Sequence, residues 1–163
     1  MLTGGPAPVR MVAVGLAVML VDQAAKWWAV HQLAPGVRHP VLPGLIYLTR
    51  VHNPGAAFGL FPYQQVFLSL GAIGLLLFAW WRRRDIQRLP KGMRFAVALG
   101  LGGAAGNLID RLWRGAVVDF IDLGVLPVFN VADMAIVAGV AILSWFVLLG
   151  RDAAEPRENE GGA

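Results

Sequence analysis

The 163-residue sequence contains no cysteine, which excludes disulfide bonds, thiolate metal sites and a cysteine nucleophile. Charged residues are scarce, at 15% of the chain, whereas 57% of the residues are hydrophobic and the mean hydropathy is +0.61. A soluble domain of this length would expose much of that apolar surface to water. The composition therefore indicates a membrane protein with a single domain.

Other reactive groups are also rare. The two serines, Ser69 and Ser144, lie outside any Gly-x-Ser-x-Gly pattern, which argues against a serine protease. The three histidines (His31, His39 and His52) show no helical metal-binding spacing, so we expect neither a metal nor a cofactor. The net charge of +4 is not spread along an aromatic-lined groove, and we expect no nucleic-acid partner.

Long apolar runs predict an all-α polytopic membrane protein with four transmembrane helices. The runs cover about residues 11–30, 66–81, 95–113 and 131–149. Six basic residues lie within residues 82–94, which indicates a cytoplasmic loop and places both termini in the cytoplasm. Residues 1–151 then form one membrane domain, and the polar tail 152–163 is expected to be disordered.

The segment of about residues 31–65 is too long for a simple connector and lies on the extracytoplasmic side in this topology. Turn-forming Pro-Gly pairs surround residues 45–51, which are rich in β-forming side chains. We expect a small extracytoplasmic β element there, although an irregular loop is the alternative. Residues 56–61 suggest a short amphipathic segment, in which Phe58 is a possible lid residue.

The third apolar run contains Gly102 and Gly106, a pair of small residues four positions apart. Such a pair lets two helix backbones approach closely in a membrane. It does not resemble a phosphate-binding loop, because no Lys-Ser or Lys-Thr follows it. We therefore expect it to pack within the helix bundle.

Two acids, Asp119 and Asp133, follow or open apolar runs. A carboxylate beside hydrocarbon is costly unless it is paired, hydrated or protonated. If the two acids met, they would hold one proton between them, as an aspartic protease requires. Each acid also has a simpler interpretation. Asp119 can be a loop acid that Asp122 replaces, and Asp133 can form a helix cap with Asn130.

Further polar residues lie within apolar context. Asp22 and Lys26 are spaced for an ion pair on one helix face, and Asp22 can also line a polar cavity. Arg111 near a helix end is expected to pair with Asp110. Asn107, one turn earlier, needs polar partners at that depth, which a hydrated cavity would supply.

Together these motifs resemble the signal peptidase II family, the lipoprotein signal peptidases. The resemblance rests on DQAAK at 22–26, NPGAAFG at 53–59, GNLIDR at 106–111, VVDFID at 117–122 and FNVAD at 129–133. It implies that Asp119 and Asp133 are the catalytic dyad. It further implies that Asn53, Asn107, Arg111 and Asn130 line or support the site, and that Asp22 stabilises it.

The same resemblance implies the reaction and its place. The expected activity is aspartic endopeptidase cleavage of diacylglyceryl-modified prolipoproteins, just before the lipidated cysteine. The enzyme would act as a monomer in the bacterial cytoplasmic (inner) membrane among its lipids, with its active site near the extracytoplasmic face. A non-catalytic membrane scaffold or a small proton-coupled transporter is the alternative, since buried acids can also relay protons.

Overall fold

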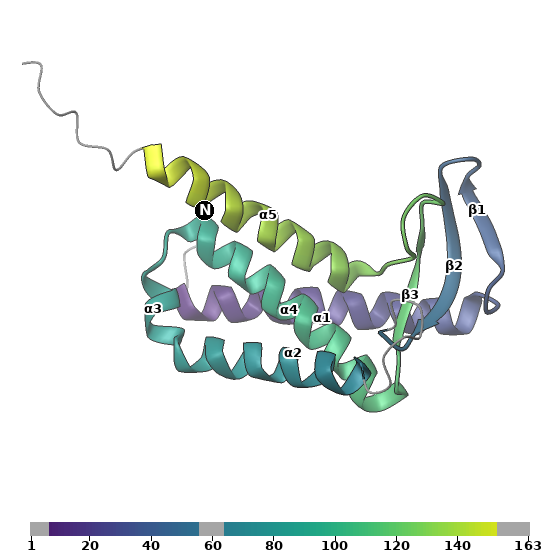
Figure 1. Ribbon diagram of the computed structural model, residues 1–163, viewed down its shortest axis with the longest axis horizontal. Coiled ribbons are helices and arrows are strands. Elements are labelled where there is room, and N and C mark those ends of the chain that lie inside the picture. Colours follow the sequence, from purple (N-terminus) through teal and green to yellow (C-terminus); the bar gives the residue numbers. More distant parts are fainter. Residues whose placement is uncertain (1–6, 56–63, 153–163) are drawn as a thin grey trace, which may run out of the picture.

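The computed structural model describes residues 7–55 and 64–152. In these ranges four long helices run side by side, and a small sheet stands at one end of the bundle (Figure 1). The long helices are α1 (Ala7–Gln32), α2 (Gln64–Trp81), α4 (Lys91–Arg114) and α5 (Val131–Asp152). A short helix, α3 (Arg83–Arg88), lies at the opposite end and occupies part of the predicted basic loop. The predicted apolar runs thus all became helices, each with slightly different ends.

The described helices differ in how well their length and hydropathy suit a membrane span. By length and hydropathy, α2, α4 and α5 are candidate membrane spans. Helix α1 is the longest, with 26 residues, but its second half contains Asp22, Gln23 and Lys26. Polar residues of this kind lower the hydropathy of a helix even when, as here, Asp22 and Lys26 are fully buried inside the protein.

Helix α4 is the centre of the bundle and packs against α1, α2 and α5. Glycines make this packing close. A Cβ atom added at Gly102 would lie 2.5 Å from the carbonyl oxygen of Gly15 in α1, and one at Gly106 would lie 2.6 Å from the Asp22 carboxylate. At Gly103 it would clash with the carbonyl oxygen of Ala132 in α5. The predicted packing role of Gly102 and Gly106 is therefore confirmed.

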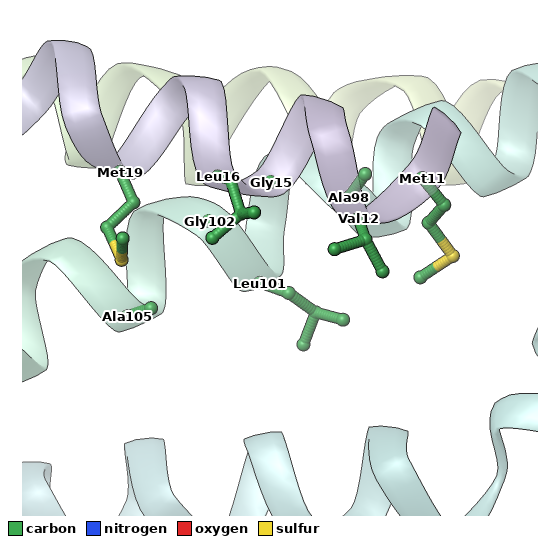
Figure 2. Close-up of a pocket in the computed structure, with 9 residues that line it drawn as sticks. All are labelled: Met11, Val12, Gly15, Leu16, Met19, Ala98, Leu101, Gly102 and Ala105. Carbon is green, nitrogen blue, oxygen red and sulfur yellow. The ribbon is translucent and has the colours of Figure 1, made fainter. Parts of the chain in front are cut away.

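The half of the bundle away from the sheet is held by apolar contacts. A cavity of about 220 Å³ lies between α1 and α4, and every residue around it is apolar (Figure 2). Both helices contribute small and large apolar residues to it. The lining residues are Met11, Val12, Gly15, Leu16, Met19, Ala98, Leu101, Gly102 and Ala105. The buried polar side chains of the described residues lie nearer the sheet.

The sheet has the strand order β1-β2-β3, and both pairs are antiparallel. Strands β1 (Arg38–Leu42) and β2 (Ile46–Asn53) form a hairpin, as the prediction of a small β element required. Strand β3 (Val117–Asp122) was not predicted. Four of its six residues are β-branched or aromatic, which favours a strand, and it pairs with β2. Its Phe120 packs with Ala29 of α1 and with Leu33, which follows that helix. The protein is thus mostly helical with a small sheet, as expected, and β3 is the strand that the prediction lacked.

The structure leaves some predictions outside its described residues. Strand β2 ends at Asn53 and helix α2 begins at Gln64. The predicted amphipathic segment 56–61, with the possible lid residue Phe58, falls between the described ranges, and residues 153–163 of the predicted tail follow them. These expectations stay predictions.

Candidate active site

Asp119 lies on β3 and is almost completely buried, with 2% of its surface exposed. Register places it opposite Val51, two residues before Asn53 on β2. The Asn53 amide donates to one carboxylate oxygen of Asp119 at 2.9 Å, and the Asn130 amide donates to the other at 2.6 Å. Asp119, for which a loop acid was the simpler interpretation, is therefore held by the sheet on one side and by the start of α5 on the other.

Burial raises the pKa of Asp119 to about 6. The two amide hydrogen bonds from Asn53 and Asn130 oppose this effect because they favour the ionised form. The nearby Asp133 carboxyl adds to the rise, and the more distant Lys26 ammonium reduces it. The proton on Asp119 therefore persists to a pH near that at which many enzymes work.

Asp133 lies in the first turn of α5 and takes part in a capping box. Its backbone N–H donates to the Asn130 side-chain oxygen at 2.9 Å, and its carboxylate accepts from the Asn130 backbone N–H at 3.2 Å. The capping interpretation of Asp133 is thus correct. Its other carboxylate oxygen accepts from the Asn107 amide at 2.8 Å, which is more than a cap needs.

Two amides connect the two acids. Asn130 donates to Asp119 and also, at 3.2 Å, to the side-chain oxygen of Asn107, which in turn donates to Asp133. No direct hydrogen bond joins the two carboxyls, both of which lie in the described part of the chain. The residues Asp119, Asn130, Asn107 and Asp133 therefore form one continuous chain of polar contacts, drawn from β3, α4 and the start of α5.

Behind this chain lies a fully buried ionic cluster centred on Lys26. Its ammonium contacts the carboxylates of Asp22 at 2.8 Å and Asp110 at 3.0 Å, and it donates to the Asn107 side-chain oxygen at 2.8 Å. Lys26, Asp22 and Asp110 all have 0% exposure. The predicted Asp22–Lys26 ion pair is confirmed. That Asp22 also lines a polar cavity stays a prediction.

The two acids of this cluster hold the backbone of the elements that bear Asp119 and Asp133. Asp22 accepts from the Ala132 N–H at 2.9 Å in the first turn of α5. Asp110 accepts from the Val118 N–H at 3.1 Å, one residue before Asp119. Asp110 also contacts Arg114, not Arg111, so the expected Asp110–Arg111 pair is wrong. Adjacent residues of a helix point about 100° apart, and Asp110 faces α1 instead.

Arg111 is half-buried on α4, near enough to Asp119 and Asp133 for its charge to act on both. Its Nε is buried and has no hydrogen-bond partner in the described ranges. Its carbonyl oxygen accepts from the Gln65 side chain at 3.1 Å, which ties this turn of α4 to the start of α2. Arg111 therefore supplies positive charge beside the two acids.

Asp122 has a different environment from Asp119 and does not replace it. The Arg38 guanidinium donates to both of its oxygens, at 2.7 and 3.0 Å, and Thr49 donates at 3.0 Å. Arg38 holds the pKa of Asp122 down at about 2. Asp122 is thus a permanently ionised carboxylate that ties β1 to β3, and none of these partners belongs to the chain of amides around Asp119.

Sequence reasoning missed the roles of Lys26 as the centre of the cluster and of Arg38 and Thr49 as partners of Asp122. The charge pattern offered only the local Asp22–Lys26 spacing, because Asp110 lies 84 residues further along the chain. Within residues 7–55 and 64–152, no three His, Cys, Asp or Glu side chains gather as metal ligands. His52 is exposed on β2 and belongs to no such cluster among these residues.

The chain matches a known protein family over most of its length. The family model for signal peptidase II matches residues 14–149. A lipoprotein signal peptidase of Moorella thermoacetica is 47% identical over 145 residues, covering 86% of this chain and 95% of that protein. One of Pelotomaculum thermopropionicum is 41% identical over 146 residues, covering 88% and 94%.

Solved structures agree with the sequence comparisons. Two structures described as bacterial membrane enzymes superpose with TM-scores of 0.78 and 0.77, at 30% and 29% identity. The first covers 85% of this chain and 92% of its own, and the second covers 94% of both. The fold and the matched family define an aspartic protease of the membrane. The chain belongs to the signal peptidase II family.

Proposed function

We propose that this chain removes the signal peptide from prolipoproteins, and that Asp119 and Asp133 together hydrolyse the peptide bond. The observation that carries the proposal is the chain of contacts Asp119–Asn130–Asn107–Asp133. It links two carboxyls from separate segments, and within residues 7–55 and 64–152 neither carboxyl forms an ion pair with a lysine or arginine. Carboxyls in this state remain available to exchange protons with a substrate and water.

The chemistry requires one proton on the pair. The pKa of Asp119, raised to about 6, keeps a proton on this member of the pair in mildly acidic solution. The ionised carboxylate takes a proton from water as the water oxygen bonds to the scissile carbonyl carbon. The protonated carboxyl donates to the carbonyl oxygen. When the C–N bond breaks, the amine leaves with a proton returned by the pair.

The neighbouring side chains would hold this pair in position. Asn53 and Asn130 fix the plane of the Asp119 carboxyl, and Asn107 fixes that of Asp133. Arg111, with a buried Nε unpaired in the described ranges, supplies positive charge next to the site. We assign it to stabilising negative charge on the substrate carbonyl oxygen or on the backbone beside it.

The position in the membrane follows from the helices. We propose that α1 is the fourth span, since 26 residues give a helix of about 39 Å against a hydrocarbon core of about 30 Å. Its polar residues Asp22 and Lys26 face α4, whereas Leu16 and Leu20 are exposed. With the basic α3 end in the cytoplasm, α1 begins and α5 ends on that side, and the dyad lies at the extracytoplasmic end (Figure 1).

This placement suits a lipid-modified substrate. A diacylglyceryl group on the cysteine after the cut would anchor the scissile bond at the outer edge of the bilayer, level with the ends of α1, α4 and α5. Exposed apolar side chains of the hairpin and of the β3–α5 connection would lie in the same interfacial layer, among them Leu42, Leu45 and Val125. Because one chain supplies every group of the proposed site, we propose that the enzyme acts as a monomer in the bacterial inner membrane.

The transporter alternative needs titratable groups spread across the membrane. The buried acids Asp22, Asp110 and Asp119 instead gather near the sheet, and α2 contains no acid at all. A proton path through the apolar half around Leu16 and Leu101 would have no side chains to carry it (Figure 2). This arrangement favours the protease.

The decisive experiment compares Asp119→Asn and Asp133→Asn with wild type in proteoliposomes. The substrate is a synthetic diacylated precursor peptide, and cleavage is followed by gel shift. Each variant should lose at least about 10³-fold in kcat/KM, because half of the acid–base pair is missing. Asp85→Asn, an exposed acid on α3, is the matched control and should keep wild-type activity.

Two outcomes would contradict the proposal. Cleavage by either dyad variant at the wild-type rate would refute the catalytic assignment. Equal cleavage of diacylated and unmodified precursor would refute the assignment of the lipid-modified substrate.

A further inference from the structure

Lys26 is an unusual residue for the interior of a membrane protein. Its side chain is completely buried, and a buried ammonium is costly unless its donors are satisfied. It has three N–H donors and three acceptors within 3.0 Å, on Asp22, Asp110 and Asn107. Two of these acceptors belong to carboxylates that balance its charge. The third is a neutral amide, which charge balance does not require.

The contact with Asn107 determines which way that amide points. Its oxygen accepts from both Lys26, at 2.8 Å, and Asn130, at 3.2 Å. If the amide were rotated by 180°, its NH₂ group would face two other donors, and an oxygen would face the Asp133 carboxylate. The ammonium therefore keeps the Asn107 NH₂ group directed at Asp133, where it donates at 2.8 Å.

We propose that Lys26 is a positioning residue for the dyad, which orients the Asn107 amide toward Asp133 and adjusts the charge state of the pair through its own positive charge. This inference rests on the proposed function. Lys26 does not touch the carboxyl of Asp119 or Asp133 and would not contact the substrate. It acts through one amide and through the field that it creates behind the site.

Several charged groups besides Lys26 act on Asp119. Asp119 is faced by Asp133 from α5, by Arg111 from α4 and by Lys26 from α1, and Asn53 and Asn130 donate to it. Lys26 is in turn faced by Asp22 and Asp110, and Asp110 by Arg114. Burial is the largest influence on the pKa of Asp119, and Lys26 opposes it. Removing the ammonium should let that pKa rise further.

The test is Lys26→Gln in the full chain, assayed in proteoliposomes with the synthetic diacylated precursor. We expect kcat to fall about 30- to 100-fold while KM changes less than about 3-fold, because the loss concerns the reacting pair and not substrate binding. The high-pH limb of the kcat/KM profile should move upward by about half a pH unit or more. Lys91→Gln, at the exposed start of α4, is the matched control and should change neither.

A purely structural Lys26 would lower the melting temperature without moving the pH profile. A folded Lys26→Gln enzyme with the wild-type kcat and the wild-type high-pH limb would overturn the proposal. Because this variant leaves Asp22 with less compensation in the interior, it can fail to fold, and a second variant then decides.

Asn107→Asp is that second variant. The new carboxyl still accepts from Lys26 and Asn130, but it places an oxygen where the Asn107 NH₂ group donates to Asp133. The positive charge of Lys26 is kept, and the melting temperature shows that the variant is folded before its kcat is measured. We expect a loss in kcat at least as large as that of Lys26→Gln. Full activity would overturn the proposal. If Asp119→Asn and Asp133→Asn are inactive while both of these variants work normally, only the role of Lys26 fails and the proposed function stands.

Discussion

The two ends of the helix bundle use the same charged residue types in opposite ways. At the sheet end, Lys26, Asp22 and Asp110 are fully buried, and each contacts partners on other elements. At the α3 end, Asp85 pairs with Arg82 at 3.0 Å and more loosely with Arg88 at 3.9 Å, and these side chains are about half or more exposed. The first arrangement fixes positions of atoms, whereas the second leaves a positive surface in water.

The energies of the two arrangements differ accordingly. Removing one partner of a buried ion pair leaves an uncompensated charge, at about 3–5 kcal/mol. An exposed pair contributes about 0–1 kcal/mol. Near α3 the cations also lie over the rings of Trp80 and Trp81, at 4.9 and 5.6 Å from the ring centres. Such a belt of cations and tryptophans suits the boundary between lipid and cytoplasm. The positions of side chains are therefore fixed most firmly at the end that bears the proposed dyad.

The largest effect should come from forcing the helices apart at the sheet end. In Gly103→Ala the new methyl group would meet the carbonyl oxygen of Ala132, so α5 has to move. We expect a loss of at least about 2–3 kcal/mol in stability and a strong loss of activity, since Asp133 is the next residue along. Gly100 lies on the same helix, and a Cβ atom added there would have no other heavy atom within 4 Å outside its own surroundings in the helix. Gly100→Ala should therefore be neutral or stabilising by up to about 1 kcal/mol.

Thermal melting in detergent and the precursor assay would measure both variants. Equal melting temperatures for Gly103→Ala and Gly100→Ala would show that the close approach of α4 and α5 is not a constraint. In that case the contrast between a tightly packed sheet end and a tolerant remainder would be lost.

A smaller effect should appear in the pH dependence of stability. The pKa of Asp119 is about 6 in the folded protein against an ordinary value of 3.8. The folded state therefore holds this proton longer than the unfolded state does, and stability is lost as pH rises from about 4 through about 6. Between pH 4.5 and 7.5 the shift corresponds to a loss of about 2 kcal/mol. Melting curves of wild type and Asp119→Asn at pH 4.5 and 7.5 would isolate this contribution, because the variant lacks the group.

The sign of this effect is the critical point. If wild type gained stability relative to Asp119→Asn between those two pH values, Asp119 would be stabilised as an anion, as Asp122 is. Its suitability as the proton-bearing member of the pair would then be refuted.

The smallest effect should follow a change at the α3 end. Arg82→Gln breaks an exposed contact with Asp85 and should change stability by less than about 1 kcal/mol and kcat/KM by less than about 2-fold. The melting temperature and the precursor assay measure both quantities. A loss comparable to that of Lys26→Gln would mean that the two ends of the bundle are energetically coupled and do not differ as their burial indicates.

Local sequence patterns were sufficient for the helices and for part of the site. Long apolar runs can form little else in a membrane, so all four became helices. The spacing of Asn130 and Asp133 is that of a capping box, and the capping box is present. The interaction between Asp22 and Lys26 also lies within one helical turn. In each case the interacting groups are neighbours in sequence.

Contacts between distant segments were beyond such patterns. Strand β3 was missed because its pairing with β2 joins residues about 70 positions apart, and a short apolar run between two helices has no distinct period. Strand β1, with Arg38, His39 and Pro40, contains few β-forming residues. Asp110 was assigned to its neighbour Arg111, although its partner is Lys26 on another helix. The local sequence allowed several partners for these residues, and contacts with distant segments determined which partner each one has.

The capping box at Asn130 and Asp133 also has a consequence for mutational tolerance. The turn that starts α5 and the turn that presents the second acid of the proposed dyad are the same four residues. A substitution at Asn130 would therefore weaken the start of the helix and displace the acid at the same time. Stability and activity cannot be varied independently at this turn, so few replacements there should be tolerated.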